Sequence, residues 1–136
     1  MPKFGSRSRK NLESCDPRLQ RIFNEVIKHV DCSVIEGHRD EKRQDKLYEE
    51  GKTQVKYPNG RHNAYPSLAI DCVPYPIDWD DRERFTLFAG FVKGIALGMY
   101  GIKLRWGGDW DSDFEVSDNR FDDFPHFEVK PEKEVA

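Results

Sequence analysis

One stretch, residues 68–73, constrains the fold of this chain more than any other. Its apolar residues predict a strand of about six residues, interrupted only by one carboxylate. Side chains alternate across a strand, so Asp71 lies on the face opposite Leu68, Ile70 and Cys72. Burying an unpaired carboxylate costs free energy. Asp71 therefore needs a metal ion, an arginine or a solvated cleft as its partner.

Three helices are predicted from acidic N-cap residues and, for two of them, from a glycine at the C-terminal end. The caps are Asp16, Asp40 and either Asp80 or Asp81, and the glycines are Gly51 and Gly101. Pro17 after the first cap suits the first helical position. Apolar residues at three- and four-residue spacing in the first and last helices predict faces that pack on a core.

Further short strands are predicted over 33–36, 102–106 and 126–129. This order of elements favours an α+β fold, with a small, mainly antiparallel sheet and the helices packed to one side. The chain of 136 residues is long enough for one hydrophobic core, so we expect a single domain over 1–136. Residues 1–15 are polar and basic and predict a flexible arm, and 130–136 predict a frayed tail.

Composition excludes several classes of protein. The charges nearly cancel to a formal net charge of −3, and no basic stripe with interleaved aromatics favours a nucleic-acid partner. Three cysteines without a CxxC pair argue against a disulfide framework and a cysteine-based zinc site. Because no apolar run could span a bilayer, we expect no stable membrane insertion. We also expect a monomer.

Two histidines join Asp71 as candidate metal ligands. His62 lies in a loop nine positions before Asp71, and His126 begins the last predicted strand. Two histidines and one aspartate can hold a zinc ion and leave one position open for water. Asp123, three residues before His126, would be the base that activates this water. The alternative for this last stretch is a surface loop that ends in a structural strand.

Asp123 and His126 can converge only if the chain turns between them, because residues three apart on a strand point to opposite faces. Pro125 makes such a turn plausible, since proline cannot donate a hydrogen bond to a ladder. We therefore expect Asp123 on the turn that leads into the strand.

Three further residues are candidates for the cleft. Arg39 could clamp a substrate carboxylate or stabilise an oxyanion, because a planar guanidinium suits either. A surface ion pair is the alternative for this arginine. His38, its neighbour, could line the cleft, and Trp110 could form one wall of it or fill the core.

Together these residues resemble a family of zinc peptidases that cut peptidoglycan stem peptides. The family contains L-alanyl-D-glutamate endopeptidases of the phage endolysin type and D-Ala-D-Ala carboxypeptidases. The resemblance rests on His62, Asp71, Asp123 and His126 in the family's order, and it covers nearly the whole chain. Further matching stretches are Gly37-His38-Arg39 with Gln44, Leu47, Tyr48, Gly51 and Lys52, and Leu104-Arg105-Trp106-Gly107-Gly108-Asp109-Trp110.

The sequence departs from the family in two places. Gly60 stands where the family often has a serine, and the spacing from His62 to Asp71 is longer by two than in compact members. These departures bear on the bond that is cut. The L-alanyl-D-glutamate bond is the first choice and D-Ala-D-Ala the second.

The resemblance implies one zinc ion held by His62, Asp71 and His126, with Asp123 as the acid–base residue. It implies bacterial peptidoglycan as substrate and a role in host cell lysis. The basic N-terminus lacks the apolar core of a signal peptide. We therefore expect synthesis in the host cytoplasm and action on the wall after membrane permeabilisation.

Two other classes stay open from the residues alone. A non-haem iron oxygenase also uses two histidines and one carboxylate, but its first histidine and acid usually lie closer in sequence. A wall-binding or phage structural module could hold a structural zinc with Asp123 as a fourth ligand. An Asp123→Ala variant that keeps zinc and loses activity would distinguish the enzyme from such a module.

Overall fold

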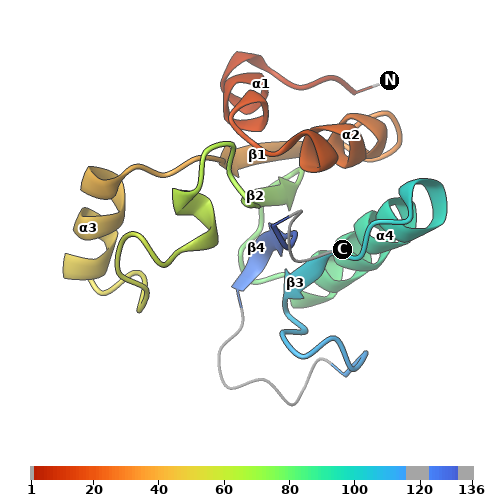
Figure 1. Ribbon diagram of the computed structural model, residues 1–136. Coiled ribbons are helices and arrows are strands. Elements are labelled where there is room, and N and C mark those ends of the chain that lie inside the picture. Colours follow the sequence, from red (N-terminus) through yellow and green to blue (C-terminus); the bar gives the residue numbers. More distant parts are fainter. Residues whose placement is uncertain (1, 116–122, 132–136) are drawn as a thin grey trace.

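The computed structural model describes residues 2–115 and 123–131 (Figure 1). Its centre is a four-stranded sheet in which neighbouring strands run antiparallel, in the order β1-β2-β4-β3. The strands are β1 (Cys32–Glu36), β2 (Ala69–Pro74), β3 (Arg105–Gly107) and β4 (Asp123–Glu128). This arrangement confirms the prediction of an α+β fold with a mainly antiparallel sheet.

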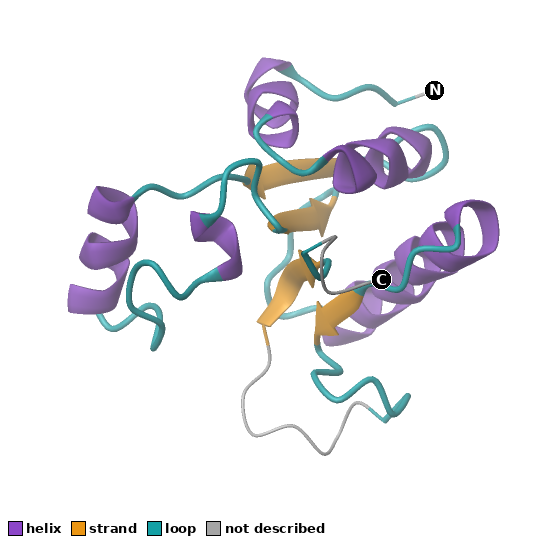
Figure 2. Ribbon diagram, viewed as in Figure 1, coloured by secondary structure: helices purple, strands orange, loops and turns teal. Residues whose placement is uncertain are grey.

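Four α-helices and one 3₁₀ helix accompany the sheet (Figure 2). They are α1 (Ser6–Glu13), α2 (Pro17–Val26), α3 (Glu41–Glu49), η1 (Arg61–Asn63) and α4 (Arg82–Tyr100). The three aspartate caps form as predicted: the side chains of Asp16, Asp40 and Asp81 each accept a hydrogen bond from a backbone N–H in the first turn.

The core lies where α2 and α4 pack against one face of the sheet. Phe127 on β4 is fully buried, and its ring contacts Phe23 of α2 and Phe88 of α4 edge-on, with centroid distances of 5.5 and 6.2 Å. Ile70 and Cys72 on β2 belong to the same buried cluster. The opposite faces of β2 and β4 therefore carry the polar residues, toward the side where η1 and α3 lie (Figure 1).

The first helix corrects one prediction, because α1 replaces most of the flexible arm expected over residues 1–15. Leu12 and Phe4 are buried in the core. Asn11 donates its side-chain amide to the carbonyl of Val34, and Ser8 accepts the Val34 N–H through its hydroxyl, at 2.9 and 3.0 Å. Side chains of α1 thus satisfy both backbone groups of Val34 on the outer edge of β1, which is an edge strand of the sheet in the described part of the chain.

The prediction of a flexible arm was wrong because it relied on the polar composition of this segment. Two of its polar side chains, Asn11 and Ser8, form hydrogen bonds with the backbone of β1. The tail predicted over 130–136 lies mostly outside the described residues, and the single domain over 1–136 stays a prediction. Among the described residues, no helix combines the length and apolar character needed to cross a membrane.

A Leu12→Ala variant tests the attachment of α1. We expect it to lower the free energy of unfolding by about 2–5 kcal/mol, because it removes a buried side chain and leaves a cavity. Leu97→Ala, on an α4 side chain that is 63% exposed, is the matched control and should cost within about 0.5 kcal/mol. Urea denaturation measures both. Equal, small losses of unfolding free energy in both variants would instead support the prediction of a flexible N-terminal arm.

Candidate metal centre

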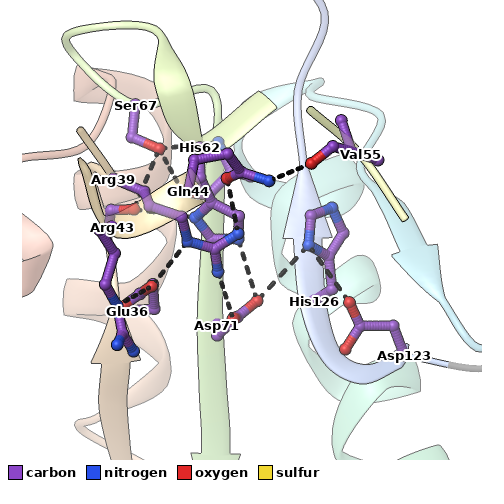
Figure 3. A network of polar contacts seen from close by, with 12 residues as sticks. Glu36, Arg39, Arg43, Gln44, Val55, His62, Ser67, Asp71, Asp123 and His126 are labelled. Atoms are coloured by element: carbon purple, nitrogen blue, oxygen red, sulfur yellow. Dashed lines mark hydrogen bonds and ion pairs between the residues drawn. The ribbon is translucent and has the colours of Figure 1, made fainter. Parts of the chain in front are cut away.

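The pairing of β2 with β4 places Asp71 directly opposite His126. The Oδ1 atom of Asp71 lies 3.4 Å from Nδ1 of His126 and 3.2 Å from Nε2 of His62. One ligand atom from each of the three residues lies within 4.8 Å of the others. The structure therefore brings together the three residues that the sequence singled out as metal ligands (Figure 3).

Both imidazole rings are oriented by a hydrogen bond from the nitrogen that faces away from Asp71. His62 donates its Nδ1–H to the carbonyl of Gly37 at 2.8 Å, and His126 donates its Nε2–H to Oε1 of Glu128 at 2.7 Å. These bonds turn Nε2 of His62 and Nδ1 of His126 toward the centre, where each nitrogen could bind a metal ion once it has lost its proton. Histidine ligands of metal ions are held in this way.

An irregularity in the sheet explains how Asp123 reaches the same place. Trp106 pairs with Phe127, but the next residue of β3, Gly107, pairs with Asp123. The intervening residues of β4 include Pro125, which has no N–H for the ladder. Oδ2 of Asp123 consequently lies 3.8 Å from Nδ1 of His126. The sequence predicted Asp123 on a turn before the strand, whereas the structure makes it the first residue of β4.

The electrostatics of the centre favour a cation. Burial opposes ionisation of Asp71, but the two histidines outweigh it and hold the pKa of this carboxyl well below its usual range. Burial also opposes protonation of His126, yet Asp71 and Glu128 raise its pKa to about 9. The pKa of Asp123 is raised by burial and by the charge of Asp71. Bound metal would replace a proton in this acidic pocket.

Arg39 lies beside the carboxylate of Asp71. Its Nη2 is 3.9 Å from Oδ2 of Asp71, its Nε donates to Glu36 at 2.7 Å, and its Nη1 donates to Gln44 at 3.1 Å. The sequence left open an ion pair on the surface. Arg39 does form an ion pair with Glu36, but both side chains are mostly buried and do not lie on the open surface. This ion pair holds the guanidinium at the edge of the centre (Figure 3).

A cavity of about 510 Å³ opens over these residues. Its walls include His62, Asp71, His126, Asp123, Arg39 and Trp110. The sequence left open whether Trp110 lines the cleft or fills the core; its ring lies 5.4 Å from that of His126, in the wall of this cavity. His38 is the exception among the predicted residues. Its Nδ1 contacts the carbonyl of Ala64, its ring packs on Tyr65, and it does not line this cavity.

Sequence reasoning missed Glu128, the partner of His126. Glu128 is buried, and its pKa is lowered because the hydrogen bond from His126 and the charges of His126, Arg105 and Arg61 outweigh the effect of burial. A signal was present, since residues two apart on a strand share a face. A glutamate two positions after a candidate ligand could have been predicted to orient it.

Comparisons with known proteins agree with this arrangement. A family model described as phage L-alanyl-D-glutamate peptidase matches residues 1–130. The chain is 29% identical over 121 residues to the L-alanyl-D-glutamate peptidase of Escherichia phage T5, covering 85% of this chain and 87% of that protein. It is 30% identical over 117 residues to the peptidoglycan L-alanyl-D-glutamate endopeptidase CwlK of Bacillus subtilis (strain 168), covering 76% of this chain and 64% of that protein.

A solved structure extends the agreement to the fold. The crystal structure of the Serratia marcescens L-Ala D-Glu endopeptidase ChiX superposes with a TM-score of 0.74 at 27% identity, covering 98% of this chain and 95% of that one. With the family model spanning almost the entire sequence, the chain belongs to the phage L-alanyl-D-glutamate peptidase family.

Proposed function

We propose that this protein is a zinc-dependent peptidase that hydrolyses the L-alanyl-D-glutamate bond of peptidoglycan stem peptides. The observation that supports this proposal most strongly is the convergence of His62, Asp71 and His126, with Asp123 beside them, in the wall of one cavity. Membership of the family supports the reaction, and the relatives' names support the choice of bond over D-Ala-D-Ala.

The donor set fits zinc. A tetrahedral zinc ion with bonds of about 2.0–2.1 Å separates its ligand atoms by roughly 3.3 Å. The Oδ1 atom of Asp71 lies 3.2 Å from the His62 donor and 3.4 Å from the His126 donor. Both rings already turn the nitrogen that would bind the ion toward the centre, so the ion would displace a proton with little rearrangement of the side chains.

The roles of the surrounding side chains follow from their positions. When bound, zinc polarises the scissile carbonyl and makes water more acidic. Asp123 faces the cavity, where its carboxylate can take a proton from the attacking water and pass it to the leaving amine. Arg39, fixed by Glu36 and Gln44, is placed to hold a substrate carboxylate or the developing oxyanion. Trp110 forms part of the cavity wall, where its ring could contact the substrate peptide.

We further propose that the protein acts on the bacterial wall as an endolysin during host lysis. This role is supported by the phage family and by the similarity to the phage T5 peptidase.

Mass spectrometry of purified peptidoglycan tests the reaction. Digestion by the zinc-loaded protein should yield fragments with a new amino-terminal D-glutamate, and a chelator should abolish them, because the metal ligands are then left without their ion. Loss of only a terminal D-alanine would mean a carboxypeptidase. Unchanged peptidoglycan from several wall types would favour a wall-binding module.

Asp123→Asn separates the acid–base residue from a fourth metal ligand. Asparagine keeps the shape but cannot accept the proton, so we expect kcat/KM to fall by about 10²–10⁴-fold. Zinc content, measured by atomic absorption, should stay at the wild-type level. Loss of zinc together with activity would instead make Asp123 a ligand of a structural metal.

Glu128→Gln tests the support of His126. The neutral amide is a weaker acceptor for the Nε2–H of His126, so we expect zinc affinity to fall by about 10–100-fold. Competition with a chelating dye measures this affinity. Glu49→Gln, an equal charge change on the exposed face of α3, should leave it unchanged. An unchanged zinc affinity in the Glu128→Gln variant would show that Glu128 does not help His126 to bind zinc.

A further inference from the structure

A second cavity of about 660 Å³ adjoins the first. The two cavities share four wall residues, which are Arg61, Trp110, Arg105 and Glu128. Because they share these walls, the two cavities lie side by side, and we call them together the trough. A peptide longer than the two residues at the cut bond has this trough available to it.

The second cavity is basic. Five of its wall residues are cationic and two are acidic, and these are Arg18, Arg61, Lys103, Arg105 and Lys130 against Asp111 and Glu128. Arg18 is engaged by Asp16 through two contacts of 3.0 and 3.1 Å. Glu128 accepts the hydrogen bond of His126. Of the remaining cations, Lys103 and Lys130 line only the second cavity, whereas Arg61 and Arg105 also line the first cavity beside the metal centre.

These two arginines converge on a single oxygen atom. Nε of Arg61 and Nη1 of Arg105 each lie 3.6 Å from Oε2 of Glu128, and their side chains are 35% and 49% exposed. The Arg105 guanidinium is stacked on Trp110, 4.8 Å from the ring centroid, which limits its freedom. A guanidinium carries five N–H donors in a planar fork. Each contact with Glu128 involves one nitrogen of the fork, and both arginine side chains line the second cavity.

We propose that Arg61 and Arg105 form a binding site for a carboxylate of the stem peptide, and this proposal rests on the proposed function. A carboxylate matches two adjacent guanidinium groups in charge and in geometry. The stem peptides of the bacterial wall carry free carboxylates that such a site could bind. The same trough joins the site to the metal centre, so one peptide can occupy both.

The position selects which carboxylate binds. Glu128 contacts Nε2 of His126, whereas Nδ1 of the same ring faces Asp71. The arginines thus lie on the far side of the imidazole ring from the metal donors. The α-carboxylate of D-glutamate is on the carbon bonded to the scissile nitrogen and must stay near the metal, within reach of Arg39. The arginine pair therefore takes a carboxylate from the next residue of the stem.

That residue distinguishes two classes of wall. In some walls it is meso-diaminopimelate, whose side chain ends in a carboxylate and an ammonium group, and in others it is lysine. Lysine equals diaminopimelate without this one carboxylate. The arginine pair then acts as a specificity determinant for diaminopimelate walls.

Two matched peptides test the site: L-Ala-γ-D-Glu-X-D-Ala, with X either meso-diaminopimelate or L-lysine. In the zinc-loaded protein, Arg61→Gln and Arg105→Gln should each lower kcat/KM on the first peptide by about tenfold, a typical loss for a hydrogen bond to a charged group. On the lysine peptide they should change it by less than about twofold. Arg9→Gln, which removes an exposed charge on α1, should alter neither.

Calorimetry of the product γ-D-Glu-diaminopimelate-D-Ala on the metal-free protein gives a readout that does not need catalysis. Its affinity should fall about tenfold in both arginine variants. Equal losses on both peptides, with weaker zinc binding, would make the arginines mere supports of Glu128 and overturn the site. Wild-type protein that cleaves neither peptide would defeat the proposed function, while arginine-dependent binding of the product would still uphold the site.

Discussion

The buried carboxylate of Asp71 is the constraint on which the rest of the structure depends. It sits in the middle of β2, between a strand on either side, where water cannot solvate it freely. Three cationic or proton-bearing partners surround it, namely His62, His126 and Arg39. Each comes from a different segment, so satisfying this one charge fixes η1, β4 and the segment before α3 relative to β2.

The orientation of His62 is tied in turn to the N-terminal helix. The carbonyl of Gly37 accepts its Nδ1–H, and Gly37 itself lies against α1. A Cβ atom at this position would overlap the carbonyl oxygen of Asn11 and the hydroxyl of Ser14. Only glycine allows this close approach. The Ser14 hydroxyl also accepts the backbone N–H of His38, the residue after Gly37. The helix that covers the sheet edge is therefore also a distant support of the metal centre.

The sequence predicted what depends on local chemistry. The aspartate caps and the alternation of β2 each act within a few residues, and the structure has them where expected. What it could not predict depends on pairing between distant segments. The use of Asn11 to satisfy Val34, and the meeting of Arg61 with Arg105 at Glu128, follow only once the strand order is known.

Asp123 differs from Asp71 in ways that bear on its role. Its side chain is 36% exposed, against 14% for Asp71, and it lies farther from the Nδ1 atom of His126. Among the described residues, it also falls outside the group whose ligand atoms lie within 4.8 Å of one another. A closed structural zinc site uses four protein ligands, whereas a catalytic site keeps one position for water or substrate. A more distant, more exposed carboxylate in the wall of the cavity suits proton transfer at that open position. The sheet irregularity at Pro125 sets this separation, so the same local break in the ladder that admits Asp123 to the centre also keeps it from closing the site.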